Sequence, residues 1–364
     1  MILVRRRPLL LALLWLVTLA VGAALVLVPT ADVNGATFTV TSTGDGADSD
    51  IFDGACDDGT EACTLRAAIA QANAVPGLDT IDFNIGGGGL QFILPGNPLA
   101  EIAEPVSIDG FSQPGSSAGA PKIVLYGNSA GSTADGLVIS SGDSTVRGLV
   151  ISGFAGSGIR IMNNGGNTLQ GNFIGTNFIG NSALPNGTGI YISNTPDNVI
   201  GGENGGDRNV ISGNREGVVI FDTTDGNSAS RNRILGNFIG TNSAGNAAVG
   251  NSNGIQIYSS NNTIGGTEAA ARNVISGNNF GVEISLTGNR VEGNLIGANL
   301  DGTASIANGT GVSIWNGWDD VIGGSAPAPG TLSLGTAPAS IFRAELATAS
   351  RAISSERQPL ARLR

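Results

Sequence analysis

The heptapeptide GNFIGTN occupies residues 171–177 and returns at residues 236–242, and the variant GNLIGAN occupies residues 293–299. A second phrase, RNVISGN, fills residues 208–214 and 272–278. Copies of the first phrase start 65 and 57 residues apart, and copies of the second start 64 residues apart. Phrases this similar that recur every 57–65 residues indicate a repeat architecture, in which each unit packs against its neighbours.

Each long unit contains two shorter coils. Both coils open with a Gly-apolar-x-apolar segment, and these segments begin at Gly158, Gly189, Gly217, Gly254, Gly281 and Gly311. Two further short apolar segments follow, separated by turns rich in Asn and Gly. Strict alternation over four or five residues is a strand signal, and there is no room for crossover helices. Equivalent strands should therefore stack in parallel, about 4.8 Å apart.

The sequence thus predicts an all-β protein, a right-handed parallel β-helix over residues 85–324. The handedness follows from the general preference of parallel crossovers. One inward column should be Ile192, Ile220, Ile257, Ile284 and Ile314. Asparagines in equivalent turns should hydrogen-bond from coil to coil, and the predicted set is Asn172, Asn214, Asn237, Asn278 and Asn294.

The two ends of the chain lack this pattern. Residues 1–36 contain three arginines followed by an uncharged apolar run at residues 8–28. This pattern predicts either a signal peptide or, because the run is long enough, an uncleaved membrane anchor. Both alternatives place the rest of the chain outside the cytoplasm. Residues 325–364 are predicted to be a disordered or aberrant tail, with truncation as an alternative.

Residues 37–84 form a different small unit with the only two cysteines, Cys56 and Cys63. In an exported chain these are expected to form a disulfide, and two free thiols are the alternative. The segment TLRAAIAQANA at residues 64–74 has apolar residues at helical spacing, with Thr64 as N-cap. A helix here would cover the open end of the β-helix.

Three phrases carry a resemblance to a known family: FTVTSTGDGADSD at residues 38–50, CTLRAAIAQANA at 63–74 and DTIDFNI at 79–85. Together they resemble the CSLREA-type N-terminal domain of bacterial secreted and surface proteins. Downstream, IDGFSQPG, STVRGLVISGF and RNVISGN are similar to right-handed parallel β-helix proteins that carry this domain. Ala67 stands where the family motif usually has Glu. The resemblance covers about residues 37–324 and implies an extracytoplasmic β-helix without a settled activity.

Net charge and the absence of His argue against nucleic-acid binding and against two classes of enzyme site. With 18 basic and 29 acidic residues the formal net charge is −11, which disfavours nucleic acid as a partner. The chain has no His, so it has no zinc-hydrolase constellation and no nucleophile activated by His.

Cleavage of a polysaccharide would need charged groups that converge on one face. The outward positions of the coil-opening strands form two columns. The first is Arg160, Tyr191, Val219, Gln256, Glu283 and Ser313, and the second is Met162, Ser193, Phe221, Tyr258, Ser285 and Trp315. Only Glu283 is a carboxylate, whereas a hydrolase needs a pair.

Other acidic residues lie in the following turns of separate coils and are interpreted as bonding their own backbone. They are Asp197, Asp222, Asp225, Asp319 and Asp320. The sequence therefore predicts no catalytic residues and a non-catalytic structural, adhesive or carbohydrate-contacting module. The alternative is a polysaccharide lyase or glycoside hydrolase of the pectin-lyase-like type.

Two candidate binding sites remain. Tyr191, Phe221, Tyr258 and Trp315 should face solvent at coil spacing and could stack on the sugars of a polysaccharide or cell-surface glycan. Packing beneath long turns is the alternative.

The other candidate is a calcium site at Asp45, Asp48, Asp50 and Asp53. A solvated acidic loop is the alternative reading, and no other cofactor is predicted.

Overall fold

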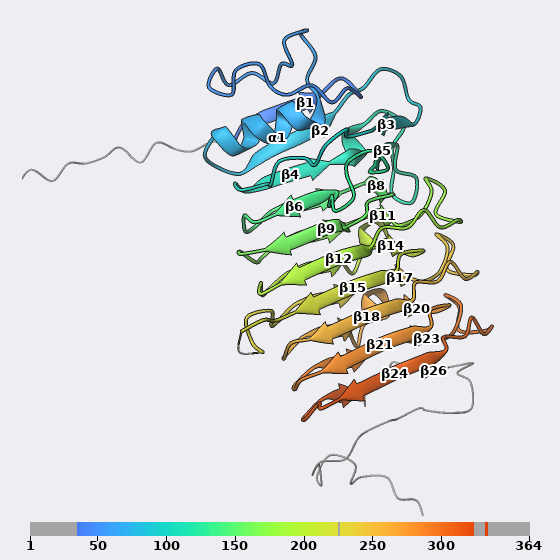
Figure 1. The fold of residues 1–364 in the computed structure, drawn as a ribbon. Helices are drawn as coiled ribbons and strands as arrows, with labels where there is room; N and C mark the ends of the chain where they lie inside the picture. The colour runs from blue at the N-terminus through green and yellow to red at the C-terminus, as the bar shows by residue number, and fades with distance from the viewer. Residues whose placement is uncertain (1–34, 225, 324–331, 334–364) are drawn as a thin grey trace, which may run out of the picture. The chain divides into compact units, whose positions relative to one another are not determined.

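The computed structural model describes residues 35–224, 226–323 and 332–333 (Figure 1). The predicted export segment and anchor therefore lie outside the described residues, apart from residues 35 and 36. The predicted tail lies outside them as well, apart from residues 332 and 333. Within the described ranges, no helix has the length and apolar character needed to cross a membrane.

The described chain folds into three parallel sheets, each made of equivalent strands from successive coils. Figure 1 shows the coils stacked one upon the next. Sheet A has ten strands: β1 (Thr37–Val40), β2 (Asp79–Phe83), β4 (Val106–Asp109), β7 (Thr145–Arg147), β10 (Thr168–Gln170), β13 (Val199–Gly201), β16 (Arg233–Leu235), β19 (Thr263–Gly265), β22 (Arg290–Glu292) and β25 (Val321–Ile322).

Sheet B has nine strands: β3 (Gln91–Ile93), β5 (Ile123–Tyr126), β8 (Leu149–Ser152), β11 (Phe173–Ile174), β14 (Val210–Ile211), β17 (Phe238–Ile239), β20 (Val274–Ile275), β23 (Leu295–Ile296) and β26 (Leu332–Ser333). Sheet C has seven: β6 (Leu137–Ile139), β9 (Ser157–Met162), β12 (Thr188–Ser193), β15 (Glu216–Phe221), β18 (Asn253–Tyr258), β21 (Phe280–Ser285) and β24 (Thr310–Trp315). The predicted right-handed parallel β-helix is confirmed.

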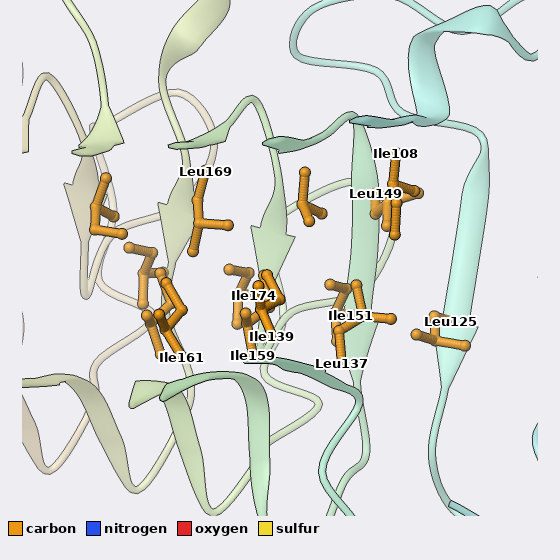
Figure 2. Packing of buried hydrophobic residues seen from close by; sticks show 14 of the residues in the cluster. Ile108, Leu125, Leu137, Ile139, Leu149, Ile151, Ile159, Ile161, Leu169 and Ile174 are labelled. Carbon is orange, nitrogen blue, oxygen red and sulfur yellow. The ribbon is translucent and has the colours of Figure 1, made fainter. Parts of the chain in front are cut away.

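The core runs along the interior of the stack, where side chains from all three sheets meet (Figure 2). Ile192, Ile220, Ile257 and Ile284 are fully buried, as predicted for one inward column. Ile314 is only half-buried. It belongs to β24, the last described strand of sheet C, so no other described strand of that sheet lies beyond it.

Three asparagine ladders run along the corners of the coils. In each ladder the side-chain oxygen of one Asn accepts hydrogen bonds from the backbone and side-chain nitrogens of the Asn in the preceding coil. The ladders are Asn167–Asn198–Asn232–Asn262–Asn289, Asn172–Asn209–Asn237–Asn273–Asn294 and Asn186–Asn214–Asn251–Asn278–Asn308.

The five asparagines predicted to share one kind of turn are thus divided between two ladders. The reason is that the Asn of GNFIGTN directly precedes a strand of sheet B, whereas the last Asn of RNVISGN follows one. The true counterparts in the RNVISGN phrases are Asn209 and Asn273. GNFIGTN and RNVISGN alternate in the same structural position, because Asn172, Asn209 and Asn237 follow one another in a single ladder.

Glycine at two turns of sheet A is required by the backbone. Gly201 and Gly265 have φ of +89° and +80°, a region that L side chains rarely adopt. A Cβ at either position would also collide with a carbonyl oxygen of the next coil, that of Leu235 or Glu292. These contacts explain why the similar phrases NVIGG, at residues 198–202, and NTIGG, at residues 262–266, both have a Gly there.

The N-terminal unit belongs to the same stack, because β1 and β2 begin sheet A. The predicted helix is confirmed as α1 (Leu65–Ala74), whose N-cap Thr64 accepts a hydrogen bond from the Ala67 backbone nitrogen over 3.0 Å. Its apolar face joins the continuous core, and α1 lies beside β1 and β2 at the first end of the stack (Figure 1). Three short 3₁₀ turns complete the described helices: η1 (Gly110–Ser112), η2 (Gly205–Asp207) and η3 (Ala269–Ala271).

Arms cover part of the outer face of sheet B. Residues 176–183, 241–248 and 298–305 fold back as short antiparallel loops and hydrogen-bond to one another, for instance from the Ser243 nitrogen to the Gly180 oxygen. Gly180 lies against the Phe173 ring beneath the arm. Phe92 of β3, the first strand of sheet B, makes an edge contact with Phe178 of the first arm, and both rings are exposed.

Candidate functional site

The outer face of sheet C carries the two predicted columns in the predicted register. Tyr191 pairs with Arg160 on one side and with Val219 on the other. Phe221 lies beside Tyr258 in the next strand. Val219 and Gln256 point outward but are buried, because neighbouring side chains of the same face cover them.

Three of the four predicted aromatic residues form a continuous row. The Tyr191 and Phe221 ring centroids are 6.4 Å apart, and those of Phe221 and Tyr258 are 5.8 Å apart with an edge-on arrangement. All three rings are partly exposed rather than buried beneath turns. Rings in this arrangement contact one another and can still present a face to a ligand.

Trp315 stands apart from this row. It lies on β24, is 43% exposed, and is separated from the strand of Tyr258 by Ser285 of β21. Within the described ranges it makes no ring contact with the other three aromatic residues.

Arg160 lies at the end of the row that is formed by Tyr191. The Arg160 guanidinium lies 5.2 Å from the centre of the Tyr191 ring, a cation–π contact. Its Nε atom is 2.8 Å from Asp135 Oδ2. The pair is close enough for an ion pair, but its angle is not that of a hydrogen bond, since Arg160 Nε has no hydrogen-bond partner. Asp135 therefore balances the charge of Arg160 without fixing its direction tightly.

Gln256 and Glu283 lie at the other end of the row, beside Tyr258. Gln256 Nε2 donates to Tyr258 Oη over 2.9 Å and to Glu283 Oε2 over 3.0 Å. Burial raises the pKa of Glu283, and this hydrogen bond only partly offsets the effect. Burial also raises the pKa of Tyr258, with Glu283 and Glu216 adding to the shift. The row therefore offers a phenol, an amide and a carboxylate beside its rings.

Asp48, Asp50 and Asp53 of the predicted calcium site converge on the side-chain nitrogen of Gln71, whereas Asp45 has a different partner. Asp45 forms an ion pair with Arg66. The other three each accept a hydrogen bond from the backbone nitrogen two residues further on, which is the geometry of Asx turns. No group of three or more His, Cys, Asp or Glu in the described ranges is arranged to hold a metal ion.

The amide of Gln71 occupies the space between these loops. Its Nε2 donates to Asp48 Oδ1, to the Asp50 carbonyl and to Asp53 Oδ1, so the acidic segment is tied to α1 by hydrogen bonds. In this arrangement oxygens of the acidic segment accept hydrogen bonds from Gln71, as in the acidic-loop alternative. The predicted disulfide between Cys56 and Cys63 is confirmed in the same segment.

The turn aspartates also lie apart. Asp197 binds Arg231, which lowers the pKa of Asp197 through their hydrogen bond. Asp222 accepts from the Thr224 nitrogen, and Asp320 accepts from the Asn289 nitrogen. They belong to different coils and do not form a catalytic pair. Asp225 lies outside the described residues.

Sequence reasoning missed one cluster, on the outer face of sheet A. Asp82, Asp109 and Arg147 lie in direct register on consecutive strands, and Arg147 binds Asp109 at 2.5 Å. Burial, followed by the nearby charge of Asp109, raises the pKa of Asp82. Phe111 lies 6.0 Å from the Arg147 guanidinium.

The phrases TIDF, SIDG and TVRG held the signal for this cluster, since each has its charged residue at the third position, within a strand of sheet A. No family model, curated protein or solved structure matches the chain. The geometry of the fold and its outer faces therefore carries the functional argument.

Proposed function

We propose that this chain is an exported β-helix protein of the cell surface or extracellular space, which contacts a polysaccharide or cell-surface glycan without cleaving it. The observation that carries the proposal is the row of Tyr191, Phe221 and Tyr258 on the outside of sheet C. Rings in mutual contact and partly exposed offer apolar faces to sugar rings.

The spacing of the row fits a chain of sugars. Successive strands rise by about 4.8 Å, which is close to the length of one sugar unit, so neighbouring coils can contact neighbouring sugars. Trp315 lies two strands beyond Tyr258 and would contact only longer chains. Since the contact is largely apolar, binding should persist at high salt.

Export is supported by two features. Residues 1–36 have the sequence pattern of a signal peptide or anchor. The Cys56–Cys63 disulfide also suits an oxidising compartment rather than the cytoplasm. The resemblance to the CSLREA-type domain points the same way.

The test is glycan-array binding by the wild type and by a Phe221→Ala, Tyr258→Ala double variant. The matched control is a Phe92→Ala, Phe178→Ala variant, which removes the exposed aromatic pair on sheet B. Loss of binding in the first variant alone is expected. Equal binding by the wild type and both variants would refute the aromatic row as the site.

One observation favours a second function, cleavage of a polysaccharide. Asp82, Asp109 and Arg147 place two carboxylates and a cation on one face across adjacent coils, and the raised pKa of Asp82 suits proton transfer. Incubation with acidic and neutral polysaccharides, with and without calcium, tests this function. Oligosaccharides released by wild type but not by Asp82→Asn would establish it and refute the non-catalytic proposal.

A further inference from the structure

The charges around the aromatic row are unevenly balanced. Arg160, which contacts the Tyr191 ring, is already paired with Asp135. Arg215, just before β15, is paired with Glu216 at 3.4 Å. Glu283 forms no salt bridge with any described residue, and its side chain accepts a hydrogen bond only from the neutral Gln256 amide among those residues. The charge that remains uncompensated at this end of the row is therefore negative.

A second acidic residue strengthens this imbalance. Asp222 directly follows Phe221 and accepts hydrogen bonds from Thr224 and Ala229 rather than from a cation. The whole chain is acidic as well, with a formal net charge of −11. Among the described residues, no unpaired arginine or lysine therefore lies along the row to receive an anionic sugar.

From these observations, and on the basis of the proposed function, we infer that the row selects neutral glycan chains and rejects polymers that carry an acidic group on each sugar. Such a polymer bound along the stack would bring one anionic group to every coil, because one sugar matches one coil rise of about 4.8 Å. The anion nearest Tyr258 would then face Glu283, and like charges at a partly desolvated contact repel.

The same groups favour hydroxyls. Tyr258 Oη accepts from Gln256, so its own proton remains to be donated. Glu283 Oε2 accepts from Gln256, while Glu283 Oε1 has no hydrogen-bond partner among the described residues. One donor and one strong acceptor thus lie at the edge of the aromatic platform, which is the set that a sugar with adjacent hydroxyls can satisfy.

The experiment compares matched polymers by calorimetry at low salt: a soluble neutral β-glucan, galactomannan and arabinoxylan, each with its own carboxymethyl derivative. Wild type should bind at least one neutral polymer, and carboxymethylation should weaken that binding about tenfold or more. Glu283→Gln should reduce the difference to about threefold, because the isosteric amide removes the repelling charge. Glu268→Gln, an exposed change between β19 and β20, should behave as wild type.

The other possible outcomes would overturn the inference, either alone or together with the proposed function. Equal or tighter binding of the carboxymethyl polymer would overturn the inference and leave glycan binding intact. A tenfold loss that persists in Glu283→Gln would make the effect steric and would also overturn it. Absence of binding to all of the polymers by a correctly folded wild type would refute the proposed function together with the inference.

Discussion

The backbone nitrogen of Asn289 donates to the Oδ1 atom of Asp320 over 2.7 Å. Asn289 is the last asparagine of the ladder that begins at Asn167. In the four preceding steps of that ladder the residue that accepts the hydrogen bond is an asparagine. Asp320 therefore ends the ladder with a carboxylate, and its second oxygen is buried without a hydrogen-bond partner. Burial raises the pKa of Asp320, and the two hydrogen bonds from Asn289 offset this only in part.

Replacing Asp320 with Asn should stabilise the protein. The amide restores the side-chain donor of the ladder and removes a buried, unpaired oxygen, a defect that costs about 1–3 kcal/mol. A raised native pKa means that the native state binds more protons than the unfolded state. Its stability is then highest below the ordinary pKa of Asp and falls as pH rises towards the native pKa.

The difference in unfolding free energy between Asp320→Asn and wild type should therefore grow between about pH 4 and pH 7. Urea denaturation across this range measures it. A variant that is less stable than wild type at pH 7 would contradict the interpretation of this ladder end.

Asn237 tests the interior of a second ladder. Its side chain donates to Ile200, Leu235 and Asn273 and accepts from Asn209. Asn237→Ala should lower the unfolding free energy by about 3 kcal/mol, because several buried backbone groups lose their partners. Asn97→Ala, at an exposed residue whose side chain makes no hydrogen bond, is the control and should be neutral. A neutral Asn237→Ala would mean that the ladder does not contribute to stability.

Ile257 tests the inward column. Ile257→Asp places an unpaired charge in a fully buried position and should cost several kcal/mol. Ile179→Asp, at an exposed position in an arm, should be tolerated. Thermal melts followed by circular dichroism compare the two, and equal melting temperatures would contradict the register.

The repeat phrases made most of the fold predictable. Similar phrases align the coils, so the outward column that contains Tyr191 and Glu283 could be assigned from spacing alone. Asp82, Asp109 and Arg147 lie in coils where the phrases have degenerated, and their register appeared only with the strand pairing. Spacing along the chain did not show that Asp48 and Asp53 accept hydrogen bonds from their own loop backbone, or that Asp45 pairs with Arg66 of α1.

The disulfide gives a chemical test of the N-terminal unit. Cys56 and Cys63 close a short loop before α1, which should contribute about 2 kcal/mol by restricting the unfolded chain. Mass spectrometry of the unreduced protein should show a mass lower by two hydrogens than the reduced form. A Cys56→Ser, Cys63→Ser variant should unfold at lower urea, whereas two free thiols in the exported protein would refute the pairing.

The most direct test of the proposed glycan contact is the dependence of affinity on chain length. The strands of Tyr191 and Trp315 are four steps apart in sheet C, about 19 Å at the usual strand spacing. Calorimetry with size-fractionated oligosaccharides of a bound neutral glycan should show affinity rising up to about five sugars and then levelling off. Trp315→Ala should weaken only the longer chains. Affinity that is independent of length, or a Trp315→Ala effect equal for all lengths, would contradict a contact that runs along the stack.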